Sequence, residues 1–144
     1  MGVTSVMRVA AAAALAATFA ACQSGTGPLD EAGFERQLHA LASLSMEAAF
    51  VADEAQAGHL TSAYVRAHVA KLLDDTAAAR HELARPALPS LAGRQQAAQG
   101  LAAQLTQALC EIATTPPDAA VPLRRQQDVA TRLKHQFDAL GGTP

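Results

Sequence analysis

Five histidines and two cysteines are the side chains of this chain best suited to bind a metal ion. Glu35 and His39 are four residues apart, which places both on one face of a helix. The Glu-x-x-His spacing of di-iron carboxylate bundles is absent from the sequence. In a helical projection, three histidines point away from the apolar stripes of their helices: His39, His81 and His135. These imidazoles therefore cannot meet at the centre of a bundle. We therefore predict no metal site and no cofactor.

His68 is the histidine nearest an interior face, because it projects about 60° from the centre of its apolar stripe. Tyr64 precedes it by one helical turn, and Asp75 follows it by about two turns. This pattern predicts an imidazole at a helix interface that is hydrogen-bonded to a neighbour. A metal or small-ligand carrier, using the bundle interior or Cys110 with nearby histidines, remains the second hypothesis.

Catalytic motifs are missing from the sequence. It contains no Gly-x-Ser-x-Gly elbow, no Gly-rich phosphate loop and no Ser/His/Asp grouping above chance. The net charge is −2 with no basic stripe and few aromatic residues, which argues against nucleic-acid binding. We expect no enzymatic activity and no catalytic residue.

Cys110 projects roughly 140° from the apolar stripe of its helix, on a face with Ala103 and Thr106. An outward thiol can pair between two molecules, bind a soft metal or react. Alternatively the thiol is inert, since the neighbouring carboxylate of Glu111 opposes formation of a thiolate.

A second apolar ridge lies on the first predicted helix. His39, Met46 and Phe50 follow one another at spacings of seven and four, about 120 to 160° from the main apolar centre of that helix. The ridge is core if the helix is wedged between two others. Otherwise it is exposed and marks a partner or dimer surface, for which Met and Phe are well suited.

Four helical patterns, separated by breakers, position these side chains. The first follows a cap at Asp30 and ends at Gly58, and the second follows a cap at Thr61 and runs to about Ala84. The third extends from near Ser90 to Thr114 or Thr115, and the fourth begins with Pro122 and stops at Gly141-Gly142. A hydrophobic staple is predicted at the start of each of the first two helices, between Leu29 and Phe34 and between Leu60 and Val65.

Each pattern carries an apolar stripe at spacings of three and four, which is typical of a helical bundle. The predicted core positions are Phe34, Leu38, Leu41, Ala48, Ala52, Val65, Val69, Leu72, Thr76, Ala79, Leu83, Leu91, Ala98, Leu101, Leu105, Ala108, Leu109, Ile112, Leu123, Ala130, Leu133, Phe137 and Leu140. Short connections make sequential helices antiparallel neighbours. The sequence predicts an all-α, up-down-up-down antiparallel four-helix bundle over residues 30–141.

The first 21 residues read as an export signal. One positive charge at Arg8 is followed by an apolar run to Ala21 that is too short to span a bilayer. Phe19-Ala20-Ala21-Cys22 resembles the lipobox of bacterial lipoproteins, which usually carries Leu three positions before the cysteine. The resemblance implies removal of residues 1–21 and attachment of lipid to Cys22, with residues 22–29 as lipidated cysteine and flexible tether.

The resemblance implies a cell-envelope lipoprotein anchored in the membrane by its N-terminal lipid. The residue after Cys22 is Gln23, which resembles the pattern of those lipoproteins that are sorted to the outer membrane. We therefore expect an outer-membrane protein facing the periplasm. We expect it to act as an adaptor or envelope component through a protein partner or a second copy. The alternative is a soluble periplasmic protein with a disulfide between Cys22 and Cys110.

Overall fold

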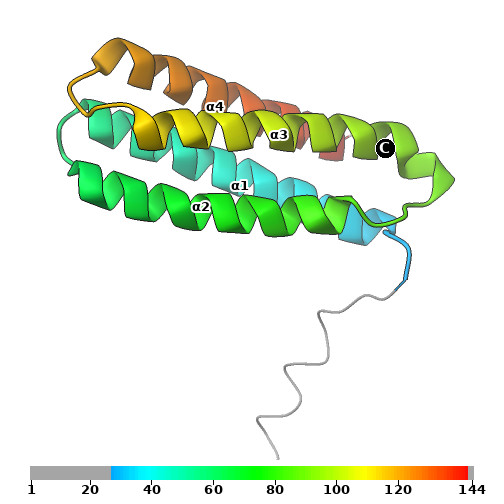
Figure 1. The fold of residues 1–144 in the computed structure, drawn as a ribbon. Helices are drawn as coiled ribbons and strands as arrows, with labels where there is room; N and C mark the ends of the chain where they lie inside the picture. The colour runs from blue at the N-terminus through cyan, green and yellow to red at the C-terminus, as the bar shows by residue number, and fades with distance from the viewer. Residues whose placement is uncertain (1–26, 143–144) are drawn as a thin grey trace, which may run out of the picture.

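A computed structural model describes residues 27–142 and is all-α (Figure 1). Its helices are α1 (Glu31–Gln56), α2 (Ser62–Leu83), α3 (Ala92–Thr114) and α4 (Ala120–Gly141), with a 3₁₀ turn, η1 (Pro89–Leu91), before α3. Successive helices run antiparallel, so the predicted four-helix bundle is confirmed. The predicted signal peptide and most of the predicted tether lie outside the described residues.

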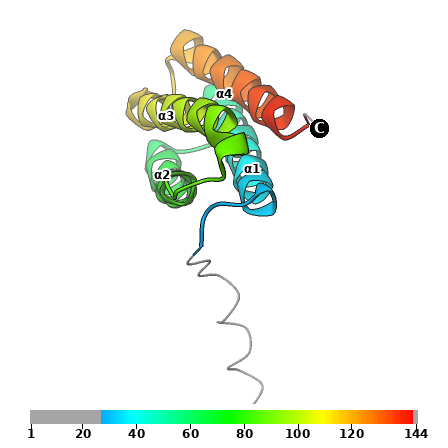
Figure 2. The ribbon, with the colours of Figure 1, turned by 90° about the vertical axis from the view of Figure 1, so that its right-hand side faces the viewer.

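The four helices are packed as two close pairs. α1 makes its most extensive contacts with α4, and α2 with α3, while α1 also touches α3 across the bundle. Figure 2 shows this arrangement from the end of the bundle at which the chain enters α1. α1 has more buried residues than any other of the four helices.

The start of α1 is fixed by the predicted cap. The Asp30 side chain accepts a hydrogen bond from the Gly33 amide at 2.7 Å. Leu29 and Phe34 are both buried, as a hydrophobic staple requires. Leu29 also donates its amide to the Pro86 carbonyl at 2.7 Å and accepts from Leu88 at 3.3 Å. Leu29 therefore belongs to the folded body rather than to the tether, one residue earlier than predicted.

The turn between α1 and α2 also forms as its residues predict. Gly58 has a φ of +75°, and the amides of Gly58 and His59 bond to the carbonyls of Ala55 at 3.1 Å and Glu54 at 3.0 Å. This is the Schellman arrangement, which satisfies carbonyls that the helix end leaves unpaired. The Thr61 side chain then caps α2 by accepting from the Tyr64 amide at 3.2 Å.

The starts of α3 and α4 differ from the sequence prediction by two residues each. Ser90, the predicted start of the third helix, lies within the 3₁₀ turn Pro89–Leu91, and α3 begins at Ala92. α4 begins at Ala120, so Pro122 is its third residue rather than its first. Proline is tolerated there because the amides of the first helical turn have no intrahelical partner.

The buried side chains follow the predicted stripes. All predicted core positions are buried except Leu101 and Leu140, which are half-buried and pack against the core. The prediction missed positions that are mostly small or polar: Gly33, Ala42, Ser45, Val51, Ala55, Ala102 and Gln126. The hydroxyls of Ser45 and Thr76 donate to the carbonyls four residues earlier, at 2.8 and 2.7 Å, which satisfies them inside the core.

Arg94 joins three helix ends at the end of the bundle where the chain enters α1. Its guanidinium donates to Glu31 at 2.5 Å and Glu35 at 2.8 Å on α1, and to the Leu140 carbonyl on α4 at 2.6 Å. It also lies 4.9 Å from the centre of the Phe34 ring. The hydrogen bond to Glu31 raises the pKa of Arg94 above its ordinary value, with a smaller contribution from Glu35. Arg94 therefore holds the start of α3 against α1 and α4.

Candidate functional site

The ridge of His39, Met46 and Phe50 lies on the solvent-exposed side of α1. All three side chains are exposed, and Met46 and Phe50 are each 61% accessible to solvent. The alternative that the ridge is core is therefore wrong. Contact with three other helices buries the opposite face of α1 but leaves this one uncovered.

A surface depression of about 330 Å³ adjoins the ridge between α1 and α4. Its apolar part includes Leu38 and Phe137, and His39 belongs both to the depression and to the ridge. The polar part comes from Glu35 and Asp138. The carboxylate of Glu35 is paired with Arg94 at 2.8 Å, and that of Asp138 with Lys134 at 2.7 Å.

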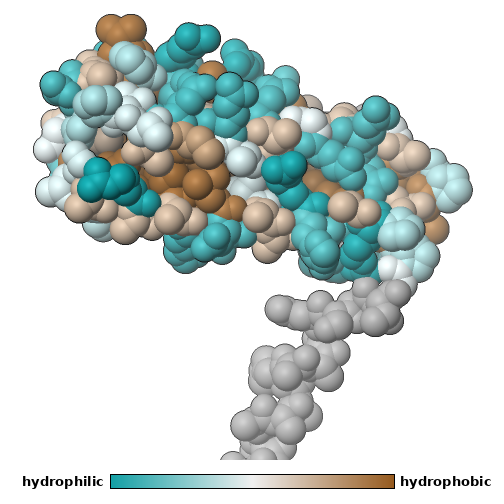
Figure 3. Space-filling model, in the orientation of Figure 1, coloured by the Kyte–Doolittle hydropathy of each residue, from teal (hydrophilic) through white to brown (hydrophobic). Residues whose placement is uncertain are grey.

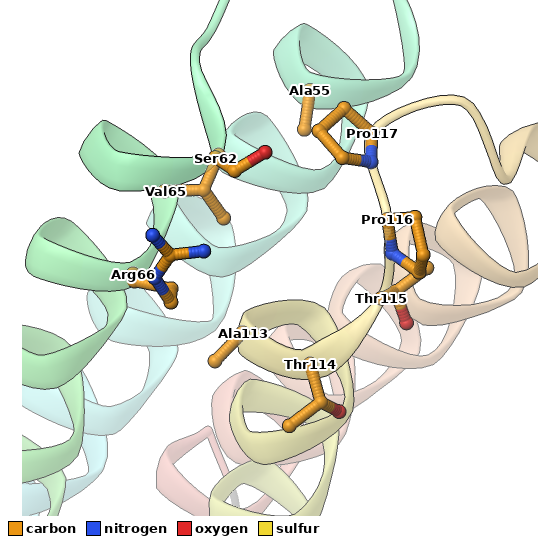
Figure 4. Close-up of a pocket in the computed structure, with 9 residues that line it drawn as sticks. All are labelled: Ala55, Ser62, Val65, Arg66, Ala113, Thr114, Thr115, Pro116 and Pro117. Carbon is orange, nitrogen blue, oxygen red and sulfur yellow. The ribbon is translucent and has the colours of Figure 1, made fainter.

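A second depression of about 270 Å³ lies between α2, α3 and the Pro116-Pro117 loop (Figure 4). Val65 and Ala113 provide apolar surface, and Figure 3 shows apolar side chains open to solvent between α2 and α3 on the same side. Arg66 lies in the lining and forms no ion pair with any residue that the structure describes.

Two of the three hydroxyls that line this second depression, those of Thr114 and Thr115 but not that of Ser62, donate to backbone carbonyls. Thr114 donates to the Cys110 carbonyl at 2.9 Å, and Thr115 donates to the Glu111 carbonyl at 2.6 Å. The lining contains no acid, histidine or cysteine. A nucleophile and its base, the minimal requirement of hydrolytic catalysis, do not come together here.

Cys110 is exposed on α3, as the projection predicted. Its neighbour Glu111 is turned toward α4, where it accepts a hydrogen bond from the buried amide of Gln126, and it also accepts from Gln107 at 3.1 Å. Cys22 lies outside the described residues, so the predicted lipidation and the alternative disulfide both remain predictions.

The interfacial position predicted for His68 is confirmed. Its Nε2 lies 2.7 Å from a carboxylate oxygen of Glu47 on α1, and its ring stacks on Tyr64 with centroids 5.7 Å apart. Asp75 pairs instead with Lys71 at 2.5 Å. Sequence spacing could not identify Glu47, because it is 21 residues away on another helix.

The histidines that the sequence turns outward do not gather. His39, His81 and His135 are all exposed. Within residues 27–142, no group of three or more His, Cys, Asp or Glu side chains lies close enough to hold a metal ion. None of the described helices has the length and apolar character needed to cross a membrane.

No family model matches this chain, and no curated protein and no solved structure matches it either.

Proposed function

We propose that this protein is a lipid-anchored component of the cell envelope that acts by binding another protein through the α1 ridge. The signal resembling a lipobox supports the anchor at Cys22, and Gln23 supports an outer-membrane location facing the periplasm. The bundle then serves as a rigid carrier that presents His39, Met46 and Phe50.

The observation that carries this proposal is the exposure of Met46 and Phe50. Two large apolar side chains one helical turn apart, each 61% exposed, are costly to leave in water and are favoured at protein interfaces. The depression beside His39 adds a concave apolar surface next to the ridge. A partner helix or loop that covers both would bury Met46 and Phe50.

Anchoring makes such a surface effective without strong intrinsic affinity. A partner in the same membrane meets the ridge at a concentration set by the tether length rather than by the bulk. Residues 23–26 separate Cys22 from Gly27, and a fully extended chain would place Cys22 at most about 18 Å from Gly27. The bundle is therefore kept close to the membrane surface.

The length of this segment also bears on the disulfide alternative. Cys110 is 18 residues beyond the first residue of α3, which corresponds to about 27 Å along the helix. Gly27 lies near the other end of the bundle, where its carbonyl accepts a hydrogen bond from Arg85. A disulfide allows about 6 Å between Cα atoms. The extended segment and the disulfide together reach about 24 Å, which is less than the distance of about 27 Å along the helix, so the lipid is the better explanation of Cys22.

Photo-crosslinking in intact cells tests the partner surface. A photoreactive amino acid replaces Phe50 in the full-length chain, and the matched control replaces Val121, an apolar residue that is 82% exposed at the start of α4. The proposal predicts a discrete crosslinked product from position 50 and none from position 121. A product of twice the chain mass identifies a second copy as the partner.

A charged variant provides the second readout. Phe50→Asp should abolish the crosslinks of a probe placed at Met46, whereas Val121→Asp should leave them unchanged. Equal crosslinking from positions 50 and 121, or products unaffected by Phe50→Asp, would overturn the proposed role of the ridge.

A further inference from the structure

The loop between α2 and α3 lies at the end of the bundle where the chain enters α1 (Figure 1). Residues 86–93 contain no charged side chain, and Leu88 is 44% exposed between two exposed prolines. Neighbouring charges are neutralised locally, since Arg85 pairs with Glu82 at 2.8 Å and Arg94 pairs with Glu31 and Glu35. This surface is therefore suited to contact with an apolar phase.

The same loop is joined to the point where the described chain begins. Leu29 exchanges backbone hydrogen bonds with Pro86 and Leu88, and Arg85 donates to the carbonyl of Gly27. Figure 1 shows the chain entering the fold beside this loop, at the end of the bundle opposite the connection between α3 and α4. A membrane anchor at Cys22, at most about 18 Å from Gly27, pulls this end toward the bilayer.

The opposite end of the bundle is too far from Cys22 to reach the membrane when the bundle stands upright. α3 alone has 23 residues and spans about 35 Å. An upright bundle on this short tether therefore reaches the membrane with the end that carries the α2–α3 loop, the start of α1 and the end of α4. A bundle lying flat would instead present one long side, such as the α1 ridge.

We propose that the α2–α3 loop is a membrane-contact site, in which Leu88 enters the lipid interface and holds the bundle upright. This inference rests on the proposed lipid anchor at Cys22. Apolar side chains that reach the boundary between headgroups and acyl chains gain burial there. An upright bundle also leaves Met46 and Phe50 facing sideways, where a neighbouring envelope protein can reach them.

Site-directed fluorescence on the lipidated full chain tests this orientation. Cys110→Ser removes the exposed thiol, and single cysteines are then introduced as Leu88→Cys, Phe50→Cys or Val121→Cys and labelled with an environment-sensitive dye. The labelled chains are incorporated into vesicles of phosphatidylethanolamine and phosphatidylglycerol with brominated acyl chains, which quench dyes that contact lipid. Phe50 and Val121 are matched controls, because both are more exposed than Leu88 in the structure.

The proposal predicts severalfold stronger quenching and a blue-shifted emission for the dye at position 88, with little change at positions 50 and 121. Equal or stronger quenching at position 50 would mean that the bundle lies on its α1 side and would overturn the proposal. Vesicle flotation separates this failure from that of the anchor. Chains that float without quenching at position 88 overturn only the orientation, whereas chains that do not float show that the anchor is wrong and the membrane contact with it.

Discussion

Phe50 and Phe137 are the same side chain in opposite environments. Phe137 on α4 is fully buried, whereas Phe50 on α1 is 61% exposed. The sequence places both on helical faces, so residue type alone does not separate a core position from a binding position. Their contributions to the free energy of unfolding should differ accordingly.

Truncation of these two residues gives the first prediction. Phe137→Ala should lower the free energy of unfolding by about 3–5 kcal/mol, because it leaves a cavity in the core. Phe50→Ala should change it by less than about 0.5 kcal/mol. Urea denaturation followed by circular dichroism measures both. Similar losses for the two variants would show that Phe50 is part of the core and would contradict its assignment to a surface.

Two glycines give the second prediction. Gly58→Ala should destabilise the fold by about 1–2 kcal/mol, because a Cβ is strained at a φ of +75°. Gly100→Ala in α3 should stabilise it by up to about 1 kcal/mol, since a Cβ there meets no atom within 4 Å and alanine favours helix. Thermal unfolding of the two variants checks the opposite signs. A stabilising effect at Gly58 would rule out the Schellman turn.

Among the elements, the helices themselves were predictable and the contacts between them were not. Every predicted core position of α2, from Val65 to Leu83, is buried. The sequence of this helix has a single apolar stripe, so only one of its faces can pack against the core. The sequence could not decide whether the second apolar face of α1 is buried or exposed. A helical projection shows which residues share a face, but not how many helices surround α1. Ala42 and Ala102 were missed because alanine occupies 36 of the 144 positions, on exposed and buried faces alike.

Polar contacts between helices could not be predicted from the spacing of residues in the sequence, for a related reason. Arg94 reaches Glu31, which is 63 residues away, and His68 reaches Glu47, which is 21 residues away. The i, i+4 rule identifies pairs within one helix, such as Lys71 with Asp75. Pairs between helices depend on their rotation and register, which the whole packed core determines.

The Arg94 contacts give the third prediction. Arg94→Ala should lower the free energy of unfolding by roughly 2 kcal/mol, because two carboxylates and the end of α4 lose their shared donor. Arg94→Lys should recover only part of this loss, since an ammonium cannot form the same fork. Arg132→Ala, at an exposed position of α4 with no ion pair to any described residue, is the control and should have an effect within about 0.5 kcal/mol. Equal effects at Arg94 and Arg132 would contradict the role of Arg94.

For the whole molecule, the proposed anchor and the proposed partner surface lie on different parts of the four-helix bundle. The tether end carries the α2–α3 loop, and the long outer side of α1 carries the ridge. Under the proposed function, the anchor fixes distance and orientation, while the ridge provides the contact. Neither role needs a cofactor or a catalytic group.

Replacement of the anchoring residue gives the fourth prediction. Cys22→Ser, in a chain whose first 21 residues are replaced by an ordinary cleavable export signal, should release the protein from the membrane fraction while the thermal unfolding of the bundle stays unchanged, because the folded body begins at Leu29. Cys110→Ser is the matched control and should leave membrane association intact. A Cys22→Ser protein that still fractionates with membranes would contradict the anchor.

The intact mass of the mature protein from the membrane fraction tests the central claim most directly. The account predicts a chain that begins at Cys22 and exceeds the polypeptide mass by a diacylglyceryl group, with or without a further acyl chain. A chain recovered in the soluble periplasmic fraction without added lipid, and lighter by the two hydrogens that a disulfide between Cys22 and Cys110 removes, would contradict it.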